Sequence, residues 1–344
     1  ELRIPVDYIA GTSMGSIIAG LYASGMTLDE IEHALKTMDW EHIFDDDPPR
    51  KELSFRRKRD DDFYLIKAKP GIRDGELQFP AGLIQGQKFD LALRELTLPV
   101  VAIEDFDQLS IPFRAVASDI GTGKEVVLRS GDLAQAMRAS MAVPGAFAPA
   151  LIDGRVLVDG GITNNLPVSV VRDMGADIVI AVDISTPLAH PDEVRNVLEI
   201  TAQLTSIMTR TNTEQQIASL TKRDVLIVPD LADITSADFT RSGEAIPAGV
   251  AAAEAKRDGL KLLSLPEPAY RAHLAARPRP SGEKPAIHFV RIKNDSNLAD
   301  EVLQERLHIR MGEPLDRVQL EKDISNIYGL ELFERVDYDV IEEN

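Results

Sequence analysis

Ser13 is the centre of the pattern Gly-Thr-Ser-Met-Gly, which follows a stretch typical of a strand, residues 6–10, and precedes one typical of a helix. A serine at a glycine-framed turn between strand and helix is held in a strained conformation with its hydroxyl exposed. Gly11 and Gly15 lack a Cβ, which lets the strand and the helix pass close to each other. The N–H groups of the first helical turn, that of Met14 among them, then face the reacting oxygen. The pattern predicts a nucleophilic serine and acyl-transfer chemistry; a tight turn with an incidental serine is the alternative.

A second candidate group, Asp159, follows a short apolar stretch that is typical of a strand, residues 155–158. Gly160 and Gly161 come directly after it and allow a sharp exit from the strand. In open α/β sheets the chemistry lies beyond the carboxyl ends of the strands, where both this turn and the Ser13 turn are expected. Asp-Gly pairs also form ordinary turns, so this segment by itself favours no chemistry. Together with Ser13, it supplies an acid that can reach the serine.

The two segments and the stretch between them resemble the patatin-like phospholipase family. That family has a serine in G-x-S-x-G, an aspartate in D-G-G or D-G-A, and between them A-S-x-A-x-P-x-x-F-x-P, which stands here at residues 139–149. Residues 115–123 and 176–183 are similar in style. The resemblance implies an α/β fold with three layers, α/β/α, and a mostly parallel central sheet.

The resemblance also implies a catalytic dyad in which Ser13 attacks an ester carbonyl and Asp159 takes its proton, with no cofactor and no metal ion. The implied substrate is a phospholipid at a membrane surface, cleaved at a carboxylic ester as by a phospholipase A. An ordinary aspartate, with a pKa near 3.9, is a weak base at neutral pH, so the dyad requires a desolvated Asp159 with a raised pKa. None of the six histidines lies within ten residues of either group.

Two other interpretations remain open. An α/β-hydrolase esterase would use a triad in the order Ser13, Asp159 and then His190 or His273. A surface module that keeps the fold could bind lipid without turning it over. Substitution of the two histidines separates the dyad from the triad, because the dyad tolerates their loss.

The family's G-G-G-x-R-G loop, which supplies N–H groups to the oxyanion hole, is not found in this sequence. Residues 1–4 look like the end of the helix that follows that loop, so we expect the N-terminal strand and the oxyanion loop to precede residue 1. The Met14 N–H remains as one donor. Each missing donor would lower the rate by about 10² to 10³.

The composition is that of an acidic globular chain: 344 residues, 44% hydrophobic and 27% charged, with a net charge of −18. Such a surface repels phosphate backbones, which argues against nucleic acid as a partner, and it also repels anionic membranes as a whole. No apolar run reaches the roughly 18 to 20 residues of a membrane-spanning helix. Without cysteine, the chain has no disulfide and no cysteine-ligated metal.

The composition changes near residue 270. We predict an acyl hydrolase domain at 1–270, a proline-rich linker at 271–285 and a second module at 286–344. The elements predicted in this module are a strand at 287–292, helices at 300–307 and 315–327, and a strand at 333–341. Their order and the runs at 287–290, 312–315 and 328–336 resemble a POTRA module, here partial because its third strand is lacking.

A patatin-like domain followed by a POTRA-like module is the arrangement of type V autotransporter lipases. The resemblance then implies a downstream outer-membrane barrel and a lipase secreted to the cell surface of a Gram-negative bacterium. The alternative is a small α+β domain that docks onto the hydrolase.

Two further segments carry predictions of their own. Four consecutive basic residues lie in a highly charged stretch at 45–62: Arg56, Arg57, Lys58 and Arg59. They could contact anionic lipid headgroups, although a solvated flap explains the stretch more simply. A long helix is predicted at 194–220, which packs one stripe on the core or, as the less favoured interpretation, faces a membrane or the second copy of a homodimer.

Overall fold

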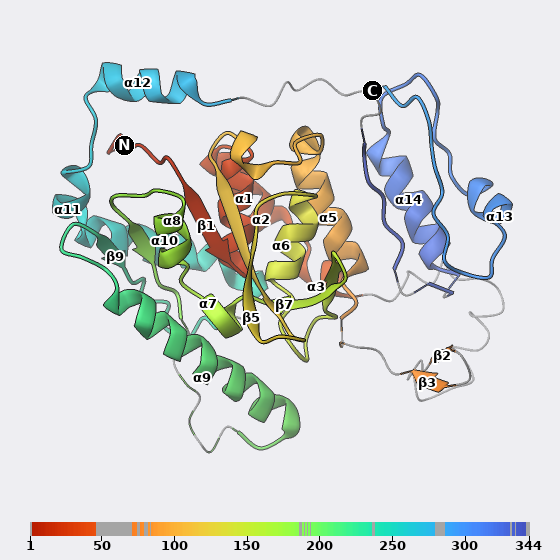
Figure 1. The fold of residues 1–344 in the computed structure, drawn as a ribbon, viewed down its shortest axis with the longest axis horizontal. Coiled ribbons are helices and arrows are strands. Elements are labelled where there is room, and N and C mark those ends of the chain that lie inside the picture. Colours follow the sequence, from red (N-terminus) through yellow and green to blue (C-terminus); the bar gives the residue numbers. More distant parts are fainter. Residues whose placement is uncertain are drawn as a thin grey trace.

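The computed structural model describes residues 2–45, 71–73, 76–78, 82, 84–185, 188, 190, 192, 194–235, 238–278, 286–330, 332–333 and 335–341. Figure 1 shows the order of its elements. The helices are α1 (Met14–Ala23), α2 (Leu28–Thr37), α3 (Trp40–Phe44), α5 (Gln87–Thr97), α6 (Leu133–Ser140), α7 (Gly161–Asn164), α8 (Val168–Asp173), α9 (Val197–Ala218), α10 (Ser242–Ala255), α11 (Arg257–Lys261), α12 (Glu267–Ala276), α13 (Asp300–Gln304) and α14 (Arg317–Tyr328). The strands are β1 (Ile9–Thr12), β2 (Gly71–Arg73), β3 (Glu76–Gln78), β4 (Phe113–Asp119), β5 (Lys124–Leu128), β6 (Ala150–Ile152), β7 (Arg155–Asp159), β8 (Ile180–Val182) and β9 (Val225–Ile227).

Strand β4 is the centre of a five-stranded sheet. It pairs with β1 in parallel as far as Thr12 opposite Val116, and with β7 in the antiparallel sense from Ala117 opposite Asp159. Val116 pairs with both β1 and β5, and Ala117 pairs with both β5 and β7. Since a strand residue has only two sides, β1 and β7 occupy the same edge of β4, one after the other. Strand β6 continues the sheet beyond β7.

Side chains alternate along β4 and divide the packing between the two faces of the sheet. Phe113, Ala115 and Ala117 are fully buried in the main core, to which α1, α2, α5 and α6 contribute. On the other face, Ser118 Oγ lies 2.8 Å from Thr163 Oγ1 of α7. Helices therefore pack on both faces (Figure 1), and the α/β class with a central sheet is confirmed.

The described sheet is mixed, which corrects the expectation of a mostly parallel one. Strand β1 is parallel to β4, but β5 and β7 are antiparallel to β4, and β6 is antiparallel to β7. A short turn explains the last pair: Asp153 and Gly154 have φ values of 51° and 73°, as in a two-residue hairpin turn. Strands joined by so short a turn must run in opposite directions.

Strands β8 and β9 form a separate parallel pair. Ala181 of β8 and Val179, which directly precedes this strand, pack with Leu166 and Val168 in a second, smaller core. Ile217 of α9 packs against it, so one face of the predicted long helix does lie on a core.

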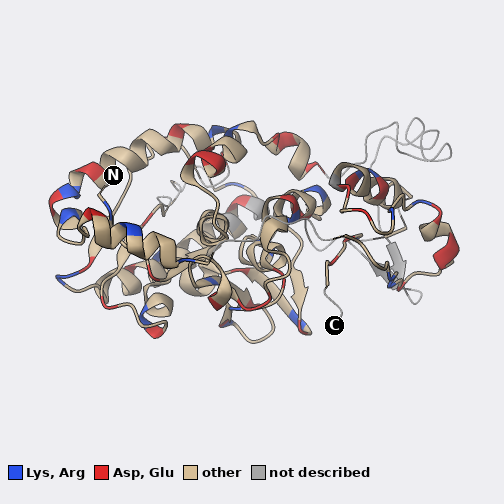
Figure 2. Ribbon diagram, turned by 90° about the horizontal axis from the view of Figure 1, so that it is seen from above, with Lys and Arg blue, Asp and Glu red and all other residues tan. Residues whose placement is uncertain are grey.

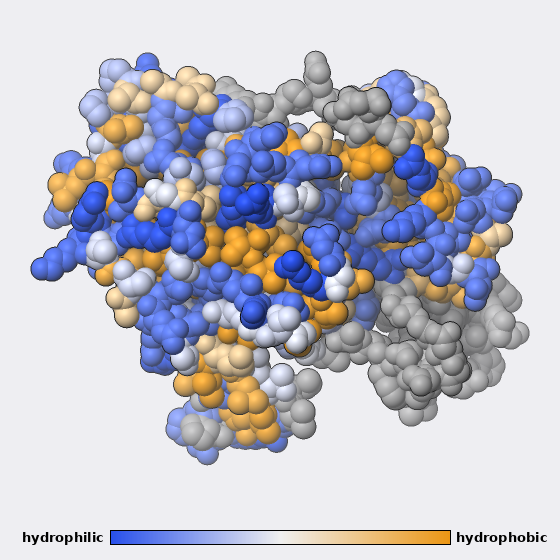
Figure 3. Space-filling view, viewed as in Figure 1, coloured by the Kyte–Doolittle hydropathy of each residue, from blue (hydrophilic) through white to orange (hydrophobic). Residues whose placement is uncertain are grey.

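The described surface mixes charges and also contains exposed apolar side chains. Figure 2 shows Lys and Arg interspersed with Asp and Glu along the ribbon. Ile200, Leu204, Ile207 and Met208, in the first part of α9, are 42–56% exposed, and Figure 3 shows apolar residues where this end of α9 protrudes. None of the described helices combines the length and the apolarity needed to cross a membrane.

The residues after 285 contain two helices, α13 and α14, near their predicted positions. The strands predicted at 287–292 and 333–341 are wrong for the described residues, which form no ladder there; Ala286 makes an isolated bridge with Pro314. A β-strand needs hydrogen-bonding neighbours along its whole length, and the described residues supply such partners only at isolated points, as at Ile287, which exchanges backbone hydrogen bonds with Gly312 and Glu313. Residues 271–276, predicted as linker, complete α12, and 279–285 lie outside the described residues.

Helix α5 holds the C-terminal segment against the rest of the molecule. The Val336 N–H donates to Gln87 Oε1 at 2.9 Å, and Arg335 forms an ion pair with Asp90 at 2.6 Å. Leu91, on the same helix, packs against apolar residues of α14. Apolar residues of α14 and of the described segments on either side of it therefore share a small core with α5.

Candidate active site

Ser13 joins β1 to α1 with backbone angles φ 55° and ψ −129°. A non-glycine residue at positive φ is strained, and such strain persists only where the surroundings hold it. The chain enters the turn from Ile9–Thr12 and leaves it directly into Met14–Ala23. This is the geometry of a nucleophile elbow, in which the serine stands at the sharp point between strand and helix.

The glycines beside the two turns differ in how much space a side chain would have. A Cβ at Gly11 would lie 2.2 Å from the carbonyl oxygen of Gly15, so the strand passes too close to the helix for any side chain. A Cβ at Gly15 would meet no atom within 4 Å, which corrects the expectation that both glycines serve the close approach. A Cβ at Gly160 would lie 2.2 Å from a carbonyl oxygen of β4, and one at Gly161 would lie 2.9 Å from the Asp159 carboxylate.

The sheet brings Ser13 and Asp159 together because β1 and β7 lie end to end along one edge of β4 and point toward each other. Strand β1 ends opposite Val116, and β7, running the other way, ends opposite Ala117. The carboxyl ends of β1 and β7 therefore converge on neighbouring residues along one edge of β4. The sequence predicted that the carboxyl ends of these two strands lie close together. It did so for parallel strands side by side, whereas β1 and β7 run in opposite directions.

The Asp159 carboxyl group is buried, with the residue 5% exposed. Its Oδ1 accepts the Gly161 N–H at 2.7 Å, while Oδ2 has no hydrogen-bond partner among the described residues. Burial raises the pKa of Asp159 to about 6, although the Ser13 hydroxyl and the Gly161 N–H both act to lower it. Asp159 is therefore a buried carboxylate near the Ser13 hydroxyl, with a pKa of about 6 and with one oxygen that accepts no hydrogen bond from the described residues.

The backbone of Ser13 is bonded on both sides. Its N–H donates to Ser140 Oγ at 2.9 Å, and its carbonyl oxygen accepts the Ser16 N–H at 2.9 Å and the Ser16 hydroxyl at 2.7 Å. The Met14 N–H, in the first turn of α1, has no acceptor within the helix and is available to a developing oxyanion. Ser140 was part of the quoted motif at 139–149, but no local pattern indicates that it contacts a residue so distant along the chain.

Several residues with predicted roles do not join this site. His190 pairs with Asp192 at 3.2 Å, and His273 lies 3.9 Å from Asp7; no described histidine hydrogen-bonds to Asp159. The basic residues Arg56, Arg57, Lys58 and Arg59 lie outside the described residues. The described part of the chain contains no cluster of three or more residues that could hold a metal ion.

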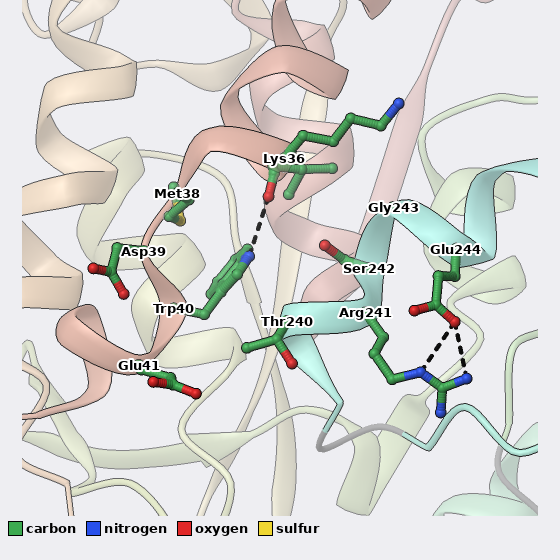
Figure 4. A pocket seen from close by; sticks show the side chains of 11 residues that line it. Lys36, Met38, Asp39, Trp40, Glu41, Thr240, Arg241, Ser242, Gly243 and Glu244 are labelled. Atoms are coloured by element: carbon green, nitrogen blue, oxygen red, sulfur yellow. Dashed lines mark hydrogen bonds and ion pairs between the residues drawn. The ribbon is translucent and has the colours of Figure 1, made fainter.

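A hollow of about 310 Å³ lies elsewhere, between the end of α2, α3 and the start of α10. Figure 4 shows that Trp40 forms part of its wall, with its indole N–H donating to the Leu35 carbonyl at 3.1 Å. On the opposite wall Arg241 pairs with Glu244 at 2.9 Å. Neither Ser13 nor Asp159 lines this hollow, so we do not assign the acyl-transfer chemistry to it.

An α/β sheet with a serine elbow and a buried aspartate defines the class of patatin-type folds. Residues 1–172 match the model of the family described as patatin-like phospholipase, and the chain belongs to that family. Membership supports lipid ester hydrolysis in general terms.

Relatives of this chain match about half of its length. An uncharacterized NTE family protein of Mycobacterium tuberculosis is 37% identical over 183 residues, which are 53% of this chain and 42% of that protein. A patatin-like phospholipase domain-containing protein of Caenorhabditis elegans is 34% identical over 188 residues, 54% of this chain and 12% of that protein. Patatin-like phospholipase domain-containing protein 7 of Rattus norvegicus is 29% identical over 189 residues, again 54% and 12%. The matched region is thus less than half of each of these relatives.

Proposed function

We propose that this chain hydrolyses carboxylic esters of phospholipids, as a phospholipase A does, through a Ser13–Asp159 dyad. The observation that carries the proposal is the pairing of a strained serine elbow with a buried carboxylate that has one unused oxygen. Such an oxygen is what a proton acceptor for the serine hydroxyl needs.

In the proposed reaction Ser13 Oγ attacks the ester carbonyl carbon while its proton passes to Asp159 Oδ2. The tetrahedral oxyanion collapses, the alcohol leaves with the proton from Asp159, and the acyl group stays on Ser13. A water molecule then gives a proton to Asp159 and attacks the acyl carbon. Ser13 Oγ leaves with that proton, and the fatty acid is released.

The electrostatics of the site supports Ser13 as the nucleophile and Asp159 as the proton acceptor. In this proposal the Met14 N–H and the positive end of α1, which directly follow Ser13, stabilise the negative charge that develops on the carbonyl oxygen. A pKa of about 6 leaves Asp159 mostly ionised at pH 7, yet still able to hold a proton for the length of one step.

We further propose that the substrate is reached at a lipid surface. The exposed apolar side chains in the first part of α9 support this, because no charged residue occurs between Glu199 and Arg210. The hydrogen bond from Asn212 of α9 to the carbonyl oxygen of Gly161, at 2.7 Å, connects the same helix to the Asp159 turn. A homodimer that covers these side chains is the competing proposal, and the oligomeric state in solution separates the two.

For residues 286–344 we propose a partial POTRA-like module of an autotransporter that carries the hydrolase to the cell surface. The sequence likeness and the two helices α13 and α14 support this proposal. Detection of the hydrolase on intact cells by surface proteolysis is its test, and protection from added protease contradicts it.

A fluorophosphonate probe, which labels activated serines, tests the dyad in the full-length protein. We expect an adduct on Ser13 by peptide mass spectrometry, no adduct in Ser13→Ala, and a strongly reduced adduct in Asp159→Asn. A variant with His190→Gln and His273→Gln is expected to label normally. Loss of labelling in that variant would instead support the triad, and a folded wild type without an adduct would support a lipid-binding module.

A further inference from the structure

Ser140 lies at the last position of α6 and is completely buried. Its Oγ is 2.9 Å from the Ser13 nitrogen and 2.5 Å from the Val116 carbonyl oxygen. Since a carbonyl oxygen can only accept, the single hydroxyl proton of Ser140 goes to Val116, and the lone pairs of Oγ face the Ser13 N–H. The direction of both hydrogen bonds is therefore fixed by chemistry.

The same end of α6 also holds the turn that bears the acid. The Gly160 N–H donates to the Ser140 carbonyl oxygen at 3.3 Å, and the Asp159 N–H donates to the Ala142 carbonyl oxygen at 2.8 Å. Ser140 thus contacts the end of β1, the middle of β4 and the turn after β7. These are the three segments whose relative placement decides whether the serine hydroxyl reaches the carboxylate.

The conformation of Ser13 makes such a contact necessary. At φ 55° its backbone is strained, and without an outside partner its N–H and side chain would relax away from the observed orientation. Ser140 is not a second nucleophile, because it is buried and its hydroxyl proton is already donated to a carbonyl.

We infer that Ser140 is a positioning residue whose hydroxyl holds the backbone of Ser13 so that the nucleophile faces Asp159. The expected effect on catalysis rests on the proposed function. The hydrogen bond that orders the Ser13 backbone can be tested whether or not the protein turns over a substrate.

The test compares Ser140→Ala with Ser24→Ala. Ser24 is a matched control, since it is 5% exposed and its hydroxyl donates to the Leu21 carbonyl oxygen at 2.8 Å, at the far end of α1. In Ser140→Ala we expect kcat and the rate of fluorophosphonate labelling to fall about 10- to 100-fold with little change in KM, because a small misplacement of a reacting group has an effect of this order. In Ser24→Ala both rates stay near the wild-type values.

The pH profile supplies a result that a merely structural role would not produce. If the Ser13 hydroxyl moves away from Asp159 in Ser140→Ala, the carboxylate loses one of the groups that lower its pKa. We expect the acid limb of the rate profile to move to higher pH in this variant and to stay in place in Ser24→Ala. Equal labelling rates and equal acid limbs in Ser140→Ala and wild type overturn the inference.

Hydrogen exchange separates this inference from the proposed function. The Ser13 amide is expected to exchange slowly in the wild type and in Ser24→Ala, and markedly faster in Ser140→Ala, as measured on peptides that span the elbow. If the wild type is not labelled by the probe, the proposed dyad fails, and the exchange result still decides the role of Ser140. Unchanged exchange at Ser13 in Ser140→Ala contradicts it.

Discussion

The Asp159 turn and the turn before β9 each bury an aspartate, but the two carboxylates have opposite surroundings. Asp159 accepts one backbone N–H and has no partner for Oδ2 among the described residues, and burial raises its pKa to about 6. Asp224, whose side chain is inaccessible to solvent, accepts N–H groups from Thr221 and Val179 at 2.7 Å and forms an ion pair with Arg172 at 2.6 Å. Burial alone would raise the pKa of Asp224, but these donors lower it to about 2.

The difference teaches how one fold uses the same side chain in two ways. Every oxygen of Asp224 is engaged, and the residue joins α8, β8 and β9 through bonds that require it to be ionised. No cation among the described residues pairs with the buried Asp159 carboxylate, an arrangement that opposes folding at neutral pH. An aspartate kept in such surroundings is poised to take up a proton, which is the property that the proposed dyad requires.

The largest expected effect is on turnover. Asp159→Asn keeps the shape of the side chain but removes the proton acceptor, so kcat should fall by about 10²- to 10⁴-fold. Asp224→Asn should leave kcat within a few-fold of wild type, once the fraction of folded protein is taken into account. Steady-state hydrolysis of a soluble ester and of phospholipid vesicles measures both. Comparable losses of kcat in the two variants would contradict a specific role of Asp159 in turnover.

Stability is expected to change in opposite directions. The folded-state pKa of Asp159 lies above its unfolded value, so its ionisation destabilises the folded state increasingly between pH 4 and 6; Asp159→Asn should therefore gain up to about 3 kcal/mol at pH 7. The folded-state pKa of Asp224 is lowered, so its contribution is present above the unfolded pKa and is lost as pH falls toward 2. Asp224→Asn should lose about 2 kcal/mol at pH 7, because its donors are left unsatisfied.

Urea unfolding at pH 7 and pH 4 checks these two shifts. The gain of Asp159→Asn should shrink close to zero at pH 4, where the wild-type carboxyl group is already protonated in the folded state. An Asp159→Asn protein less stable than wild type at pH 7 would mean that the native carboxylate has stabilising partners absent from the present description.

The rate profile of the wild type should show an acid limb centred near pH 6, with activity falling about tenfold for each pH unit below it. The sign follows from the role of Asp159, which acts in its ionised form. Rates measured in constant-ionic-strength buffers from pH 4 to 9 give the midpoint. A profile that stays flat through pH 5 speaks against Asp159 as the base.

The smallest effect concerns the turn after Asp159. In Gly161→Ala the new Cβ would lie 2.9 Å from Oδ1 and displace the one N–H that the carboxylate accepts. The pKa of Asp159 should rise, moving the acid limb up by about one pH unit. Gly249→Ala, where a Cβ meets no atom within 4 Å, is the control and should not move it. An unmoved limb in both would show that this N–H does not tune Asp159.

The local elements around Ser13 could be predicted from the sequence, because they depend on neighbours in the chain. The helix after the serine occurs where the pattern places it, whereas the strand is Ile9–Thr12, which begins later than the predicted residues 6–10 and includes Gly11. The hairpin of β6 and β7 was missed, although an Asp-Gly pair between two short strand-like stretches, here Asp153-Gly154, is its usual signal. The head-on approach of β1 and β7 and the bond from Ser13 to Ser140 depend on register between distant strands, which no local pattern encodes.

For the two strands predicted near the C-terminus, the local sequence pattern was misleading. Alternating residues at 287–292 and 333–341 satisfy the local rule for a strand, yet a ladder also needs a neighbouring strand along its length, and the described residues provide only isolated partners there. The raised pKa of Asp159 likewise depends on the folded molecule, since burial cannot be read from local sequence. The proposed chemistry requires a raised pKa, but the sequence does not give its value.

The bond network between α5 and the C-terminal segment bears on how the hydrolase part can be produced. A recombinant fragment cut at the predicted linker loses Arg335, the first of the cations that hold down the pKa of the buried Asp90 carboxyl group. It also uncovers Leu91, which is 7% exposed in the intact chain. Such a fragment exposes an apolar face that the intact chain covers, so it should aggregate more readily than the intact chain.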